Sequence, residues 1–97
     1  MQSLYRVEAE ADVANARRWY ENQQPGLGRS FQAALRRAED LLKRHPLAFP
    51  IAHVDYRRLV LRQFPYTVYY RPLGADQIEI VAVLHQRQDE DILDARE

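Results

Sequence analysis

The segment from Tyr56 to Arg87 alternates apolar residues with side chains that can bind anions or transfer protons. If it forms β-strands, every second side chain points to the same face of a sheet. One face and its rim would then carry Arg57, Arg58, Arg62, Tyr69, Arg71, His85 and Arg87. Guanidinium groups form forked hydrogen bonds to phosphate oxygens, and a tyrosine ring offers a plane for base stacking. The pattern predicts a surface that holds a phosphodiester backbone or docks an acidic protein.

Structural alternatives stand beside each of these roles. His85 can act as an acid or base near neutral pH if it faces a substrate, but a histidine at the end of an apolar strand is more often structural. An arginine on an exposed strand face is more often a solvated side chain. His53 and Asp55 resemble a metal-binding pair without a third ligand, so we expect neither a metal nor a cofactor.

Three strands are expected, at residues 56–62, 66–71 and 78–85, because apolar residues recur there with a period of two. Leu59, Val68 and Ile80 mark the apolar face, and the phase continues to Ala82 and Leu84. The third strand is almost wholly apolar, which is typical of a central strand covered on both faces.

Two helices precede the strands. The first, near residues 8–23, has an apolar stripe of Ala9, Val13, Ala16 and Tyr20. A Pro25–Gly28 turn separates it from a second helix that ends near His45, with a stripe of Phe31, Leu35, Ala38, Leu42 and His45. We expect a short strand at 4–7, an irregular crossing loop at 47–54, and a short acidic helix or tail at 89–97. The prediction is an α+β fold in which the helical hairpin covers the Leu59 face of the sheet.

Composition limits the class of protein. The 97 residues fit a single domain spanning 1–97. Fourteen basic and fourteen acidic side chains cancel, so no overall field draws the chain to nucleic acid or anionic lipid. There is no cysteine, no signal-peptide pattern and no apolar run of bilayer length. We expect a cytoplasmic protein that does not associate with membranes.

The three segments WYENQQPGLGRSF, YRRLVLRQFPYTVYYR and IEIVAVLHQRQDED, in this order, resemble the RelE/ParE superfamily of type II toxin–antitoxin toxins. The resemblance is greatest to the group called plasmid stabilisation proteins, and it covers roughly Val7 to Asp91. It implies an N-terminal strand and a helical hairpin packed on a mostly antiparallel sheet. It also implies a toxin that forms a hetero-oligomer with a cognate antitoxin, whose C-terminal segment folds around it.

The superfamily holds two biochemical classes. RelE-like members cut messenger RNA on the ribosome without a metal, and ParE-like members inhibit DNA gyrase. Cleaving members usually carry basic residues at the positions of Arg58 and Val60, an Arg at Thr67 and an Arg close to His85. Of these positions only Arg58 keeps the basic residue, because Val60 and Thr67 are uncharged. Each missing transition-state cation costs roughly a hundredfold to a thousandfold in the rate of cleavage. The resemblance therefore favours a ParE-like toxin that binds its target, plausibly gyrase, over an enzyme.

Two alternatives remain. One is a metal-independent endoribonuclease that uses His85, Arg58, Arg62 and Arg71 on ribosome-bound mRNA. The other is a degenerate toxin that retains only antitoxin binding.

The chain has more large apolar side chains than the two helical stripes need to cover the sheet, namely Trp19, Leu27, Phe31 and Phe49. They form either a groove for the antitoxin or the closure of the core.

Overall fold

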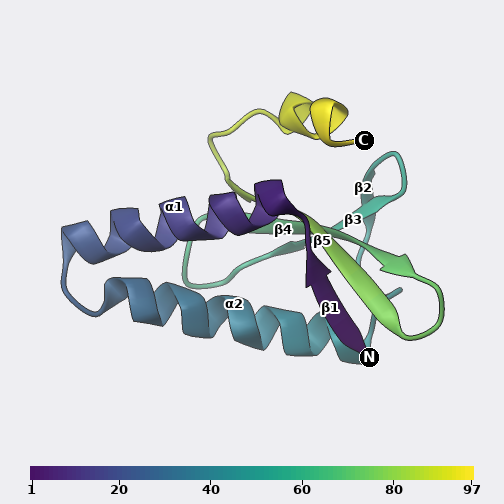
Figure 1. Ribbon diagram of the computed structural model, residues 1–97, viewed down its shortest axis with the longest axis horizontal. Coiled ribbons are helices and arrows are strands. Elements are labelled where there is room, and N and C mark those ends of the chain that lie inside the picture. Colours follow the sequence, from purple (N-terminus) through teal and green to yellow (C-terminus); the bar gives the residue numbers. More distant parts are fainter.

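The computed structural model describes residues 1–97, which form a five-stranded sheet with two helices on one face and a 3-10 helix on the other (Figure 1). In chain order the elements are β1 (Gln2–Tyr5), α1 (Val7–Gln23), α2 (Leu27–Arg44), β2 (Ile51–His53), β3 (Tyr56–Val60), β4 (Tyr66–Leu73), β5 (Gln77–His85) and η1 (Glu90–Arg96). The sheet order is β1-β5-β4-β3-β2. Only β1 and β5 are parallel, so the sheet is mixed and mostly antiparallel, as predicted.

The helical hairpin forms because each helix has one apolar stripe and the turn between them is short. Gly26 has a φ of 95°, a left-handed conformation that favours glycine. The carboxylate of Glu21 accepts hydrogen bonds from the backbone N–H groups of Gly26 and Gly28, and these bonds lower its pKa. A side chain at Gly28 would lie 2.9 Å from the carbonyl oxygen of Arg17. Close approach of the helices at the turn therefore requires glycine there.

The main core lies between the hairpin and the sheet. Ala9 and Ala16 of α1 and the α2 residues Phe31, Leu35, Ala38 and Leu42 are buried against Leu59, Val68, Tyr70, Ile78 and Ile80 of the sheet and against Leu61. His45, predicted as the last residue of the α2 stripe, is exposed just after the helix ends. The prediction that the hairpin covers the Leu59 face is confirmed. Tyr70 is fully buried and its hydroxyl donates to the carbonyl of Pro46 at 2.7 Å, while burial raises its pKa to about 12.

A β-bulge in β5 changes the predicted phase. Tyr69 pairs with Ala82 and Tyr70 with Ile80, so Val81 is an extra residue on its strand. Beyond the bulge, Val83 belongs to the hairpin side, and Ala82 and Leu84 belong to the opposite core. The predicted orientation of Ala82, Leu84 and His85 is therefore wrong.

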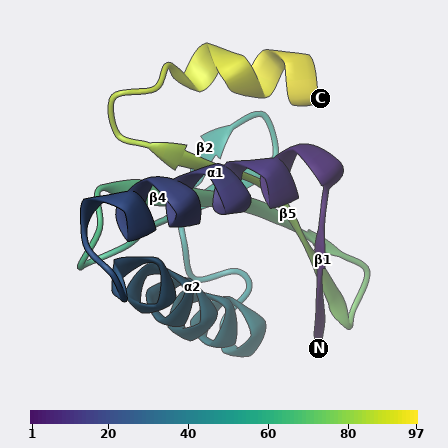
Figure 2. The ribbon, with the colours of Figure 1, turned by 60° about the vertical axis from the view of Figure 1, so that its left-hand side comes forward.

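One further element differs from the sequence prediction, and for another the structure decides between the two predicted forms. The expected irregular loop at 47–54 contains the edge strand β2, which pairs with β3. The acidic C-terminal segment is a short helix, η1, whose Leu93 is fully buried. Figure 2 shows η1 and α2 on opposite sides of the sheet. Beneath η1 lies a second core of Tyr56, Tyr69, Val81, Ala82, Leu84 and Leu93.

The N-terminal end of α1 holds η1 in place. Asp12 accepts two hydrogen bonds from the Arg96 guanidinium, at 2.6 and 3.0 Å. One of its oxygens also accepts the backbone N–H of Val83 at 2.9 Å. Both side chains of this ion pair are only 13% exposed, so a single carboxylate connects α1, β5 and η1.

Candidate target-binding surface

The sheet face opposite the hairpin carries Arg58 and Tyr69, but η1 covers much of it. Tyr69 is buried, which corrects the prediction that it is exposed. Its hydroxyl donates to Oε1 of Glu90 at 2.7 Å, and a guanidinium nitrogen of Arg58 lies 3.6 Å from the same oxygen. Burial, with the Glu90 hydrogen bond, raises the pKa of Tyr69 far above its ordinary value, so its hydroxyl stays a donor. Arg58 remains half exposed beside it.

Arg71 lies in a separate ionic cluster on this face. Its Nε donates to Glu79 at 2.9 Å, and Nη1 lies 3.5 Å from Asp55. Arg6 also donates to Glu79 at 2.9 Å, and the two guanidinium groups lie 5.5 and 5.9 Å from the ring centre of Tyr56. The hydrogen bond from Arg6, followed by that from Arg71, lowers the pKa of Glu79 despite its partial burial. Arg71 is thus engaged by two carboxylates and by an aromatic face.

His85 lies on the other side of the sheet, which overturns its predicted place beside Arg58. Its ring packs edge-on to Tyr66 with centroids 5.1 Å apart, and its Nδ1 accepts the backbone N–H of Arg87 at 3.0 Å. His85 borders a groove of about 540 Å³ along α1, which Trp19 also lines. The bulge at Val81 is the physical reason, since it reverses the phase of the strand before it reaches His85.

The remaining arginines of the predicted surface have different surroundings. Arg57 turns to the hairpin side and donates to the carbonyl groups of Leu47 and Phe49, which anchors the segment that crosses from α2 to β2. Arg62 and Arg87 are exposed beyond the ends of β3 and β5. Of the predicted set, Arg58 and Tyr69 meet at Glu90, and His85 and Arg87 contact each other only through the local backbone hydrogen bond.

The four apolar residues predicted to bind an antitoxin do not converge. Phe31 is fully buried in the main core, so for this residue the structure supports the alternative of core closure. Trp19 is 56% exposed and lines the α1 groove. Phe49 lines a second groove, of about 370 Å³, between α2 and β3, and Leu27 is partly buried at the hairpin turn.

The groove between α2 and β3 is the more apolar of the two. It is lined mainly by Ala34, Ala38, Leu41, Phe49, Leu59 and Val60. Leu41 and Val60 are 37% and 51% exposed. Leu41 is next to the stripe residue Leu42, and Val60 stands between Arg58 and Arg62 in the alternating pattern of β3, so no sequence pattern indicates this groove.

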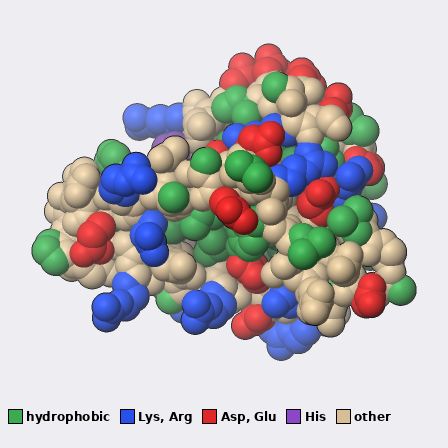
Figure 3. All heavy atoms as spheres, in the orientation of Figure 1, with side chains coloured by type: hydrophobic (Ala, Val, Ile, Leu, Met, Phe, Trp, Pro, Cys, Tyr) green, Lys and Arg blue, Asp and Glu red, His purple; other side chains and the backbone are tan.

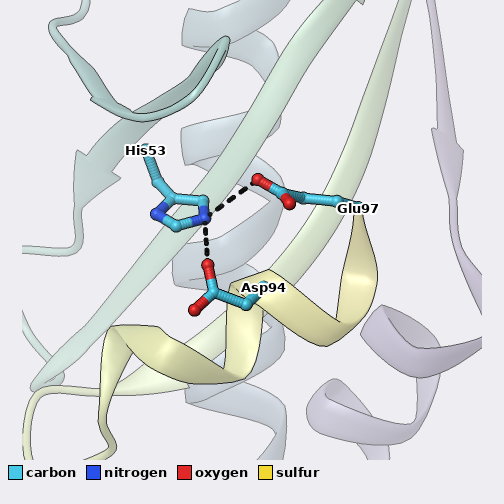
Figure 4. A group of neighbouring side chains, drawn as sticks. All are labelled: His53, Asp94 and Glu97. Atoms are coloured by element: carbon cyan, nitrogen blue, oxygen red, sulfur yellow. Dashed lines mark ion pairs between the residues drawn. The ribbon is translucent and has the colours of Figure 1, made fainter.

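Figure 4 shows a further polar group that joins β2 to η1. Nε2 of His53 lies 3.0 Å from Oδ1 of Asp94 and 3.3 Å from Oε1 of Glu97. Asp55, which the sequence paired with His53, instead faces Arg71. The group places two carboxylates of the C-terminal segment at ion-pair distance from the sheet edge, although neither forms a hydrogen bond to Nε2. Its carboxylates lie more than 40 residues from His53 in sequence, and no local motif indicated it.

The comparisons with known proteins agree with this arrangement. The family described as "ParE toxin of type II toxin-antitoxin system, parDE" matches residues 4–90. The chain belongs to the ParE toxin family. It is thus the toxin of a type II toxin–antitoxin module, and ParE toxins pair with ParD antitoxins. The predicted superfamily and fold class are confirmed.

A solved structure supports the fold independently. A chain from the structure titled "Chromosomal ParDE TA system from P. aeruginosa" superposes with a TM-score of 0.73 at 19% sequence identity. The alignment covers 88% of this chain and 95% of that chain. A comparison with proteins of curated function gave no match. Neither α1 nor α2 is long and apolar enough to cross a membrane.

Proposed function

We propose that this ParE toxin arrests growth by binding and inhibiting DNA gyrase, and that it does not cleave RNA. The observation that carries the proposal is the separation of the four residues that an RNase would use. His85 lies on the hairpin side of the sheet and Arg62 lines the groove beside α2, whereas Arg58 and Arg71 lie on the opposite side.

Metal-free cleavage of RNA needs a base at the 2′-hydroxyl and a cation at the same phosphodiester. Side chains on opposite faces of a sheet do not reach one phosphodiester group together. Arg71 is held by Glu79 and Asp55, and Arg58 by Glu90. Thr67, at which cleaving relatives carry an Arg, is buried, and Val60 is apolar. These placements support docking over catalysis.

The side chains best suited to docking are exposed arginines on and beside the sheet. Arg58 is half exposed on the η1 face, and Arg62 and Arg87 are exposed beyond the ends of β3 and β5. Guanidinium groups of this kind suit a carboxylate-bearing protein surface. The ParD antitoxin then neutralises the toxin, and the two apolar grooves are the places where one of its segments would pack.

Expression of the chain in bacteria, with and without its antitoxin, tests the proposal. We expect growth arrest with induction of the DNA-damage response, while messenger RNA on translating ribosomes stays uncut. Co-expression of the antitoxin should restore growth. Unimpaired growth would indicate a degenerate toxin, and site-specific mRNA cuts would indicate an endoribonuclease; either result contradicts the proposal.

A further inference from the structure

The chain is neutral overall, but its charges are separated in space. Acidic side chains gather over η1, and Lys and Arg side chains project along the opposite edge, where α2 runs (Figure 3). The cations of α2 are Arg29, Arg36, Arg37, Lys43 and Arg44. Although the net charge of the chain is zero, α2 is therefore strongly cationic.

These five cations share the solvent face of α2. At 100° per residue, Arg29, Arg36 and Lys43 form a row with a spacing of seven residues, and Arg37 and Arg44 form a second row beside it. Successive cations in a row are about 10.5 Å apart along the helix axis. The opposite face of α2 carries the buried stripe, so the cationic face points away from the core.

None of the five lies within ion-pair distance of a carboxylate. Arg37 donates to the amide oxygen of Gln63, and Arg44 donates to a backbone carbonyl of its own helix. By contrast, Arg6, Arg58, Arg71 and Arg96 are all engaged by acidic partners. Asp40 is the one acidic residue between the two rows. The positive charge of this face is therefore not neutralised within the fold.

The composition of this face indicates whether it suits a protein or a nucleic acid as its partner. Protein interfaces have an apolar core depleted in charge, whereas interfaces with DNA are polar and strongly positive. Between the two rows of cations, α2 exposes Ala33 and Asp40, and Ser30 and Leu41 are exposed beside the second row. Four of the five cations are arginines, which bind phosphate through two parallel hydrogen bonds. We propose that the exposed face of α2 binds the phosphate backbone of duplex DNA without sequence specificity. This inference is independent of gyrase as the target.

The test is binding of the purified chain to a fluorescein-labelled 20-base-pair duplex, measured by anisotropy over a range of salt concentrations. With about three phosphates neutralised, the logarithm of the association constant should fall against log salt with a slope of about −3. Arg36→Glu removes the central cation of its row, and we expect at least a tenfold loss of affinity at low salt and a slope smaller by about one. Arg36 is exposed and makes no hydrogen bond, so the fold should be retained.

The double variant Gln86→Glu, Ala95→Glu is the matched control, because it makes the same change in net charge at two exposed sites outside α2, one of them in η1 on the opposite side of the sheet (Figure 2). We expect less than about a twofold loss for it. Equal losses in both variants would show a non-local charge effect and overturn the proposal. Absence of DNA binding at low salt would also overturn it. So would an Arg36→Glu variant that binds DNA normally but loses affinity for the antitoxin, since α2 would then be a protein-docking face.

Discussion

Asp12 connects three elements through one carboxylate. It accepts the guanidinium of Arg96 and the backbone N–H of Val83, and both side chains of the ion pair are largely buried. Asp12→Ala leaves a buried cation and a strand N–H without partners. We expect the free energy of unfolding to fall by about 2–4 kcal/mol.

Urea denaturation at neutral pH measures this loss. Asp76→Ala, in the exposed loop before β5, is the control and should change stability by less than about 0.5 kcal/mol. An Asp12→Ala variant as stable as this control would mean that Asp12 does not hold η1 to the fold.

Glu79 makes stability depend on pH. Hydrogen bonds from Arg6 and Arg71 lower its pKa below the ordinary 4.5, so the folded state favours the carboxylate. Its contribution is therefore fully present above the unfolded pKa and is lost as the pH falls through the lowered folded value. The stability difference between the wild type and Glu79→Gln should be largest at neutral pH and shrink below about pH 4.

Urea titrations at a series of pH values measure that difference. If the difference in free energy of unfolding between the wild type and Glu79→Gln stays constant down to about pH 2.5, Glu79 contributes to stability through packing alone.

At the scale of elements, the sequence predicts η1 as a short helix or tail but does not predict its packing on the sheet. Leu93 is fully buried beneath it in the second core. Leu93→Ala should cost about 2–4 kcal/mol and speed amide exchange throughout η1, because the helix loses its one fully buried anchor. Ile92→Ala, at a half-buried position, should have a smaller effect on both. If the amide exchange rates of η1 are the same in Leu93→Ala as in the wild type, the ion pairs of Asp12 and His53 hold η1 without the apolar contact of Leu93.

The elements differ in how far the sequence predicts them. The stripes of α1 and α2 follow a period that only a helix satisfies, and Leu59 and Val68 fix the apolar face of β3 and β4. From Ile80 to Leu84 every residue is apolar, so either phase is acceptable and the bulge at Val81 has no signature. That one residue decides on which face His85 lies.

Contacts between residues far apart in the sequence explain most of the other features that the sequence does not predict. The acidity of η1 conceals Leu93, and the partner of Arg96 lies 84 residues away at Asp12. The edge strand β2 has only three residues, directly after Pro50, too few for a period to appear. The candidate site could therefore be predicted as a list of residue types but not as an arrangement.

At the scale of the whole molecule, the fold separates three kinds of surface. The η1 side carries acidic residues with Arg58 beneath its edge, α2 carries unpaired cations, and two apolar grooves border the hairpin. A toxin that acts by docking needs such surfaces for its antitoxin and its target, and it needs no assembled catalytic group. This division explains how a neutral chain of 97 residues can engage partners of different chemistry.

Supercoiling by purified gyrase tests the central claim most directly. Relaxed plasmid, gyrase and ATP are incubated with increasing amounts of the chain, in parallel with reactions that also contain its antitoxin. The proposal predicts loss of supercoiled product at low micromolar toxin, within the range of specific protein complexes, and recovery of activity with the antitoxin. Full supercoiling at toxin concentrations far above that range would contradict it.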